Sequence, residues 1–219
     1  MRIRQRIIVA ILLWVSAAAA QDGAPLSTSQ SYELDPAESG FYVLVFRGGL
    51  LAGLGHNHVV SLPSIRGRVS VDPATRTLDL LLSLPVHDFV IDDPVLRAAE
   101  GRRFEDEIPG DARAGTRDNL LGPRLLDADA YPNINVRARS YRGELPDVVV
   151  EATVEVRGVE HRVDFPLSIT LDTERFEASG ELELRHEDIG LRPFRAALGT
   201  LRVRNEMVLR YEFAANASD

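Results

Sequence analysis

Apolar and polar residues alternate with a period of two along most of this chain, and this alternation limits the possible folds more than any other feature. The clearest runs lie at residues 78–84, 148–156, 163–171 and 201–213, with a shorter one at 182–184. Less regular runs lie at residues 32–35, 41–47, 54–60, 66–72 and 134–139. Turn pairs are expected to separate the runs, at Asp72-Pro73, Arg157-Gly158 and Ser179-Gly180. Side chains of a strand point alternately to opposite faces, so these runs indicate strands with one buried and one solvated face. The sequence therefore predicts an all-β, antiparallel fold.

One segment between the two halves of this series, residues 93–127, has helical spacing instead. Asp92-Asp93 offers an N-cap, Pro94 suits the first helical position, and apolar residues continue at helical spacing to Phe104. A second short helix is expected to begin at Thr116 and to end at Gly122-Pro123. Because antiparallel strands with few helices close economically into a barrel, we expect about eight strands in a barrel with these helices as a lid over one open end.

The N-terminus has the order of a secretory signal peptide. Three arginines precede an apolar stretch from Ile7 to Val15, and small residues follow as far as Ala20. An uncleaved membrane anchor is the alternative, but a spanning helix needs about 20 consecutive apolar residues and this stretch is shorter. We therefore predict a signal peptide at residues 1–20, cleavage near Ala20, no transmembrane anchor after cleavage, and a periplasmic or secreted product. A disordered leader at residues 21–30 and a folded domain at 31–214 are expected to follow.

Composition excludes several classes of function. The chain has no cysteine, so disulfides, thiolate ligands, cysteine nucleophiles and a cysteine-linked lipid are all ruled out. Its 25 basic residues are all arginine; three lie in the predicted signal, so 22 remain against 33 acidic residues and the mature charge is −11. No basic stripe of the kind that binds nucleic acid is visible. The sequence contains no nucleophile elbow, phosphate-binding loop or zinc-protease helix, which favours a binding protein over an enzyme.

Continued alternation predicts four polar residues on buried strand faces: His56, His58, His186 and Asn205. Buried polar groups need partners, so these side chains either pair with one another or contact a bound molecule. An eight-stranded barrel is just wide enough to hold one small ligand, although side chains could also fill it completely. A filled barrel would act only through its surface.

His56 and His58 also fit a second hypothesis, a metal site. Two imidazoles two residues apart on a strand face the same way, and a metal site usually takes about three or four protein ligands. The further ligands would have to come from His87, His161, His186 or carboxylates. A metal-binding protein or enzyme using His56 and His58 is therefore the alternative to a binding protein without cofactors.

Several segments together resemble one known family, the YceI-like proteins. Thr116 to Leu120 and then Leu126 to Ile134 are similar to that family's arginine-aspartate turn and its tyrosine-proline approach to a strand. Val154 to Leu167 resembles its glycine-centred hairpin, and Arg185 to Gly190 resembles a further short motif. The likeness runs in order from about Tyr32 to Phe213. Asn119 and Leu120 replace a small residue and a histidine of the commoner pattern, and Gly55-His56-Asn57-His58 is typical of a variant subgroup.

The resemblance implies an exported, lipocalin-like barrel that holds a long amphiphilic lipid, such as a polyisoprenoid, a quinone or a fatty-acid derivative. On this interpretation the bound lipid is the only cofactor-like molecule, and a homodimer is possible. Arg117 is expected to have a structural role at the lid. The residues expected to contact the ligand are His56, His58, His186, Asn205, Phe89, Leu120 and Tyr211.

Overall fold

The computed structural model describes residues 29–196 and 200–218. The predicted signal peptide and nearly all of the predicted leader lie outside the described residues. The first strand begins at Gln30, within one residue of the predicted start of the folded domain.

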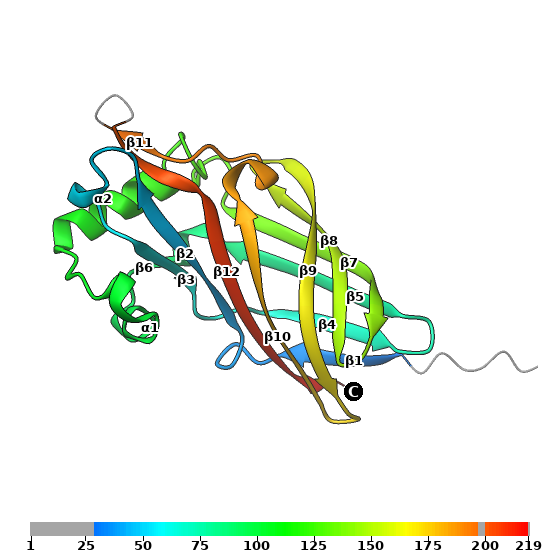
Figure 1. The fold of residues 1–219 in the computed structure, drawn as a ribbon. Helices are drawn as coiled ribbons and strands as arrows, with labels where there is room; N and C mark the ends of the chain where they lie inside the picture. The colour runs from blue at the N-terminus through cyan, green and yellow to red at the C-terminus, as the bar shows by residue number, and fades with distance from the viewer. Residues whose placement is uncertain (1–28, 197–199, 219) are drawn as a thin grey trace, which may run out of the picture.

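The fold consists mainly of strands that all pair in antiparallel fashion (Figure 1). The strands are β1 (Gln30–Leu34), β2 (Gly40–Gly48), β3 (His58–Leu62), β4 (Gly67–Asp72), β5 (Thr77–Pro85), β6 (Val90–Ile91), β7 (Asn133–Glu144), β8 (Asp147–Val156), β9 (Val159–Leu171), β10 (Arg175–Arg185), β11 (Arg195–Ala196) and β12 (Leu201–Ala217). Two α-helices, α1 (Pro94–Ala99) and α2 (Gly110–Leu121), and four short 3-10 helices, η1 (Ala52–Leu54), η2 (Val86–Asp88), η3 (Gly101–Phe104) and η4 (His186–Ile189), complete the described elements.

Eight of these strands close into a barrel, as the alternation predicted. The order around the barrel is β1-β4-β5-β7-β8-β9-β10-β12, and β12 returns to β1 through the pairs Tyr32 with Ala217 and Leu34 with Ala215. One edge of β12 is occupied by β10, so β1 and β2 take consecutive stretches of its other edge. β3 and β6 extend the wall beyond β2. β1 therefore closes one end of the barrel, and β2 and β3 form the wall toward the other.

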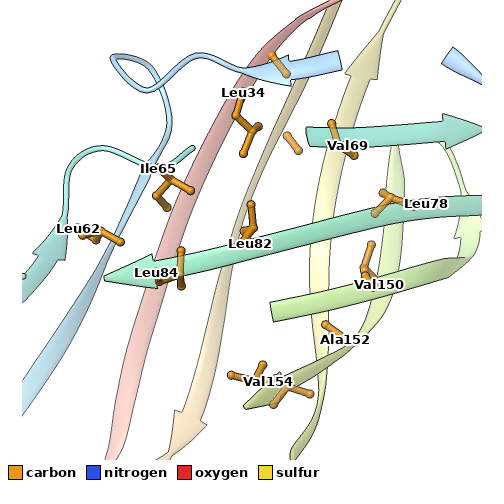
Figure 2. Close-up of a cluster of buried hydrophobic side chains, with 14 of the residues drawn as sticks. Leu34, Leu62, Ile65, Val69, Leu78, Leu82, Leu84, Val150, Ala152 and Val154 are labelled. Atoms are coloured by element: carbon orange, nitrogen blue, oxygen red, sulfur yellow. The ribbon is translucent and has the colours of Figure 1, made fainter. Parts of the chain in front are cut away.

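The alternating apolar residues converge on the interior. Figure 2 shows side chains from β1, β3, β4, β5 and β8 turned toward a common space. Along β8 the buried positions are Val148, Val150, Ala152, Val154 and Val156, whereas the residues between them are more exposed. This period-two burial is the reason why the sequence specifies these strands so clearly.

The strand expected at residues 54–60 begins later than predicted. Residues 52–54 form η1 and β3 starts only at His58. The Asn57 side chain accepts a hydrogen bond from the Arg47 backbone N–H (3.0 Å) and donates one to the Arg103 carbonyl (2.8 Å). Because the side chain of Asn57 satisfies the edge of β2, the β2–β3 ladder ends there. The prediction that strand alternation sets the orientation of His56 was wrong for this reason.

The helical insertion consists of α1, η3 and α2, which do not all lie in the same place relative to the barrel. α1 begins as predicted, with Asp93 accepting hydrogen bonds from Val95 and Leu96 N–H and Pro94 at the first position. It ends early because Gly101 adopts a left-handed φ of 67°. α1 and η3 pack outside the barrel, where Leu44, Val59 and Phe104 form a second small core.

α2 also starts earlier than predicted, at Gly110 rather than Thr116, and ends at Gly122 as expected. None of its residues is buried, so no apolar pattern marks its first half. Among the described residues, no helix combines the length and the apolar character needed to cross a bilayer.

Candidate functional site

A cavity of about 220 Å³ lies inside the barrel. Of the residues that line it, only His186 and Tyr211 carry a polar nitrogen or oxygen in the side chain; the others are aliphatic residues, phenylalanines and Met207. They come from the barrel strands, from β2 and β3, and from the segments after α2 and β10. The apolar members include Leu34, Phe41, Val43, Val45, Val60, Leu78, Leu82, Phe89, Leu120, Leu125, Val150, Ala152, Val154, Phe165, Phe176, Ile189, Met207 and Phe213.

The cavity is long and narrow. Its lining extends from Leu34 and Phe176, beside β1, to Leu125 and Ile189, beside α2 and η4. Along β8 alone the lining residues run from Val150 to Val156, about 20 Å of strand at ~3.3 Å per residue. A volume of about 220 Å³ spread over that length describes a tunnel rather than a round pocket.

β1 closes the tunnel at one end. Tyr32 is fully buried there, its ring contacts Phe176, and its hydroxyl donates to the Asp172 carbonyl (2.6 Å). Burial raises the pKa of the Tyr32 phenol, so the hydroxyl keeps the proton that it donates. At the other end Leu120 of α2 and the following Leu125 and Leu126 line the cavity. α2 therefore contributes to the lid that the sequence predicted, whereas α1 does not.

His186 is the polar residue of the tunnel with hydrogen-bonding capacity to spare. It is buried, and its Nδ1 lies 2.9 Å from the Asn205 carbonyl oxygen. A carbonyl can only accept, so Nδ1 carries the hydrogen and Nε2 is an acceptor in the neutral ring. Nε2 is left without a partner in the part of the protein that the structure describes.

The other polar group, Tyr211, is already satisfied by the protein. Its hydroxyl donates to the Pro166 carbonyl (2.6 Å), and burial raises the pKa of the phenol. Gly180 makes this contact possible, because a Cβ at that position would lie 2.2 Å from the Pro166 oxygen and 2.6 Å from the Tyr211 ring. Tyr211 therefore offers the cavity an aromatic face rather than a free hydroxyl.

Pro166 also ends the pairing between β9 and β10. These strands pair only from Ser168 with Ser179 to Leu171 with Phe176, although β9 continues to pair with β8 and β10 with β12. Proline has no N–H to donate, so a ladder cannot continue through it on that side. The strands then diverge toward η4 (Figure 1), and we call their unpaired stretches, residues 159–167 and 180–185, the β9–β10 seam.

The seam is covered at its wide end by the segment after η4. Gly190, at a left-handed φ of 71°, lies against the ring of His161, where a Cβ would come within 2.8 Å. Phe165, Leu167 and Leu184 line the cavity beside the seam. The seam is thus a side of the tunnel held by side-chain packing rather than by backbone hydrogen bonds.

His58 lies outside the cavity lining and belongs to a buried ionic network. Its Nδ1 is 2.7 Å from Asp92 Oδ2, and Arg97 donates to Asp92 Oδ1 at 2.7 Å. Arg97 also donates to the carbonyls of Asn57, Phe104 and Asp106. The network joins β3 to α1 and η3, so this part of the Gly-His-Asn-His segment anchors the helical insertion. The sequence suggested only a helix cap at Asp92-Asp93 and gave no role to Arg97.

The charge of Asp92 is stabilised by its partners. Burial alone would raise the pKa of this carboxyl, but hydrogen bonds from His58 and Val59 N–H, the charge of His58 and the Arg97 guanidinium together hold the pKa below its usual value. Asp92 is fully buried and adopts a left-handed φ of 57°, which aspartate tolerates better than most residues.

The other predicted site residues divide between the cavity and its surroundings. Phe89 and Leu120 line the cavity with His186 and Tyr211. Asn205 does not, because its amide donates to Glu187 (2.9 Å) and it lies where the β2–β12 register shifts between Val203 and Met207. Arg117 donates to the carbonyls of His87 and Phe89, a structural role as expected.

His56 also lies outside the lining. Its ring centroid is 6.3 Å from that of His58, and its Nδ1 is buried without a hydrogen-bond partner. Within the part of the chain that the structure describes, no three potential metal ligands lie together. The carboxylate beside His58, that of Asp92, is paired with the Arg97 guanidinium.

The comparisons with known proteins agree with this architecture. Among solved structures, Burkholderia cenocepacia BcnA superposes with a TM-score of 0.59 and 13% identity over 83% of this chain and 99% of that one. A Campylobacter jejuni YceI protein superposes with a TM-score of 0.51 and 12% identity over 73% and 85%. A variant of that protein, crystallised with a monobromobimane guest, gives a TM-score of 0.52. The comparison with curated proteins returns no match.

The solved structures are too distant in sequence to show more than the fold, but a family model is more specific. The model of the YceI-like domain matches residues 32–215, which is most of the chain and nearly the whole barrel. The chain therefore belongs to the YceI-like domain family.

Proposed function

We propose that this protein is exported and binds the hydrocarbon part of a long amphiphilic lipid, such as a polyisoprenoid, a quinone or a fatty-acid derivative, in the barrel tunnel. The observation that carries the proposal is the continuous apolar lining, to which His186 adds a ring nitrogen without a partner among the described residues. An apolar cavity of roughly 150 Å³ stays dry and takes up small apolar molecules, and this cavity is larger. Its length and narrowness suit one extended chain.

His186 gives the tunnel a preference for an amphiphile over a pure hydrocarbon. A hydroxyl or protonated carboxyl on the ligand would donate to Nε2 while Nδ1 stays bonded to the Asn205 carbonyl. Phe89, Leu120 and Tyr211 would contact the chain. The proposed role is carriage or sequestration of an envelope lipid, in the periplasm or outside the cell, with no chemical step.

Binding is tested first on protein purified gently from its own host. Mass spectrometry of an organic extract is expected to give a stoichiometric lipid, and the intact mass is expected to correspond to a chain beginning at Gln21. Extracts that are repeatedly free of lipid would count against carriage. An intact Met1 would count against export and leave binding open.

A displaceable fluorescent fatty acid then locates the site. Ala152→Phe places a ring in the tunnel, because Ala152 is buried and lines the cavity. The matched control, Glu151→Phe, adds the same ring on the exposed outer face of the same strand. We expect the first variant to reduce affinity at least tenfold and the second to leave it unchanged. Equal affinities in both variants would place the binding site outside the tunnel.

His186→Leu tests the polar contact in the same assay. A neutral hydrogen bond contributes about 1 kcal/mol, so affinity for a fatty alcohol should fall about fivefold while affinity for an alkane of equal length is unchanged or rises. An equal loss for both ligands would mean that His186 acts only through packing.

A further inference from the structure

An exposed apolar tip lies at the end of β2 nearest β11. Leu50, Leu51 and Leu54, which we call the leucine tip, are 92%, 42% and 75% exposed. Large exposed apolar residues elsewhere, such as Leu81 and Val95, stand alone, and scattered single residues are normal on protein surfaces. Three leucines within five residues form a patch, which calls for an explanation.

The leucine tip is held outward by its backbone. Leu51 N–H donates to the Thr200 carbonyl (2.9 Å), and Leu54 N–H to the Leu51 carbonyl (2.9 Å). Gly49, at a φ of 92°, allows the close approach to Thr200, because a Cβ would lie 2.4 Å from that carbonyl. η1 has no buried residue, so these bonds form a defined turn that presents leucines to solvent.

Six arginines line hollows beside the tip, one of which is also lined by Gly49 and Ala52, in a chain whose net charge is −8. Two adjoining hollows share Arg47 and Arg204 and are lined between them by what we call the arginine cluster: Arg47, Arg102, Arg103, Arg195, Arg202 and Arg204. The hollows contain two carboxylates, Asp106 and Glu206, and among the described residues only Arg47 of the cluster forms an ion pair, with Asp106.

The cluster includes one pairing that is unfavourable in isolation. Arg195 of β11 lies directly opposite Arg202 of β12, and like charges opposite each other destabilise a sheet. Some arginines elsewhere, such as Arg142 and Arg175, are paired with carboxylates. An anionic surface placed against this end would neutralise the cluster.

We propose that the leucine tip and the arginine cluster form a docking surface for an anionic lipid bilayer. Peripheral binding to membranes combines apolar side chains inserted at the headgroup boundary with basic side chains attracted to anionic lipids, and this surface offers both. A second copy of this chain is a poorer occupant, because a two-fold contact would bring the arginine cluster against itself.

The docking surface continues into the cavity wall, which gives docking a purpose. Met207 of β12 pairs with Val45 of β2, and both line the tunnel. Arg202 and Arg204 lie earlier on β12, between Met207 and the tip. Figure 1 shows β11 and the start of β12 at the end of the barrel away from β1. Only the connection between docking and the tunnel rests on the proposed lipid carriage. The docking proposal itself is argued from the leucine tip and the arginine cluster.

Cosedimentation with vesicles tests the proposal. Purified protein whose N-terminus has been established by mass is mixed with vesicles of phosphatidylcholine alone or of phosphatidylcholine and phosphatidylglycerol in equal amounts. We expect binding to the anionic vesicles that weakens as salt is added, and little binding to the neutral ones. Absence of binding to anionic vesicles, with fatty-acid binding intact, overturns docking and leaves lipid carriage standing.

Matched variants assign the binding to this surface. Arg202→Gln with Arg204→Gln is expected to weaken binding about thirtyfold, at ~1 kcal/mol for each arginine near an anionic surface. Leu50→Ser with Leu54→Ser is expected to weaken it at least tenfold. The controls, Leu81→Ser and Arg139→Gln, change exposed residues of the same kinds on β5 and β7 and should have no effect.

Two further results would overturn the proposal. One is an equal loss of vesicle binding in the controls. The other is concentration-dependent self-association of the wild type that the tip variants abolish in sedimentation velocity, because it would identify the surface as an interface between copies. Fluorescent fatty-acid binding is measured in every variant and should stay at the wild-type level.

Discussion

Asp92 is held in place by charge and hydrogen bonds rather than by packing. Its carboxylate is completely removed from solvent and contacts one arginine, one histidine and one backbone N–H. Its left-handed backbone, next to the extended Ile91 and the N-cap Asp93, turns the chain from β6 into α1. Asp92 therefore joins β6 to α1, and the local sequence of neither element predicts the position of the other.

Replacing Asp92 by asparagine should measure the contribution of that charge. Asparagine keeps the shape and tolerates the left-handed backbone, but it leaves Arg97 buried without a carboxylate. Removing one partner of a buried pair is strongly destabilising, and we expect Asp92→Asn to lower the free energy of unfolding by about 3 kcal/mol in urea titrations. Asp93→Asn is the control. It should change the free energy of unfolding by less than about 0.5 kcal/mol, because aspartate and asparagine are about equally good N-cap residues.

The same pair of variants gives an expectation for pH. The pKa of Asp92 is lowered in the folded protein, so its stabilising contribution is present above the unfolded value, near 4, and is lost as pH falls through the folded value. The difference in stability between wild type and Asp92→Asn should therefore shrink as the solution is made more acidic below about pH 5. A difference that does not change down to the acid transition would show that charge is not the cause.

At the scale of elements, alternation predicts which residues form strands but not where two strands stop pairing. β9 and β10 each show apolar residues on one face along their length, yet they hydrogen-bond to each other over only four residues. The signal was present in Pro166 and Gly180, one unable to donate and the other without a side chain. Strand periodicity alone cannot show where the pairing of two strands stops, because the inward and outward positions of each strand are unchanged when the hydrogen-bonded ladder ends.

Gly180→Ala tests how the seam is built. A methyl group there meets a backbone carbonyl and the Tyr211 ring, so the two strands must move apart. We expect a loss of about 1–3 kcal/mol in the free energy of unfolding, as for other overpacked positions. Gly115→Ala in α2, where a Cβ meets open space, should instead stabilise by about 0.5–1 kcal/mol. If Gly180→Ala is as stable as wild type, the close packing of Tyr211 across the seam is not required.

At the scale of the whole molecule, three surfaces with different chemistry are built from one alternating pattern. The inward positions form the tunnel, the outward positions carry the excess of acidic groups, and one end collects six arginines beside exposed leucines. The sequence predicted which strand positions face inward and which face outward, because both depend on strand parity, but it left open whether side chains fill the interior. It did not predict the arginine cluster, because Arg47, Arg195 and Arg202 come together only through the β2–β12 and β11–β12 pairings.

The prediction of the candidate site residues depended on strand parity in the same way. Tyr211 lies on a regular strand, where parity extends reliably, and it lines the cavity. His58 is the first residue of β3 and has the same parity as the cavity-lining Val60, but its side chain pairs with Asp92 in the ionic network and does not line the cavity. His186 continues to face inward although β10 ends at Arg185, because η4 turns back over the barrel.

The closed end of the tunnel predicts how binding should depend on ligand length. Each methylene buried contributes about 0.8 kcal/mol, so the stabilisation of the protein by saturated fatty alcohols, compared at one free concentration, should rise with chain length. The rise should stop once the chain reaches Tyr32 and Phe176, since further carbons would stay outside.

Ala152→Phe, which obstructs the middle of the tunnel, should move this plateau to shorter chains, and Glu151→Phe should not. The measurement is the urea midpoint across a homologous series of alcohols. A stabilisation independent of chain length, or a plateau at the same length in Ala152→Phe, would show that the hydrocarbon does not lie along the barrel axis.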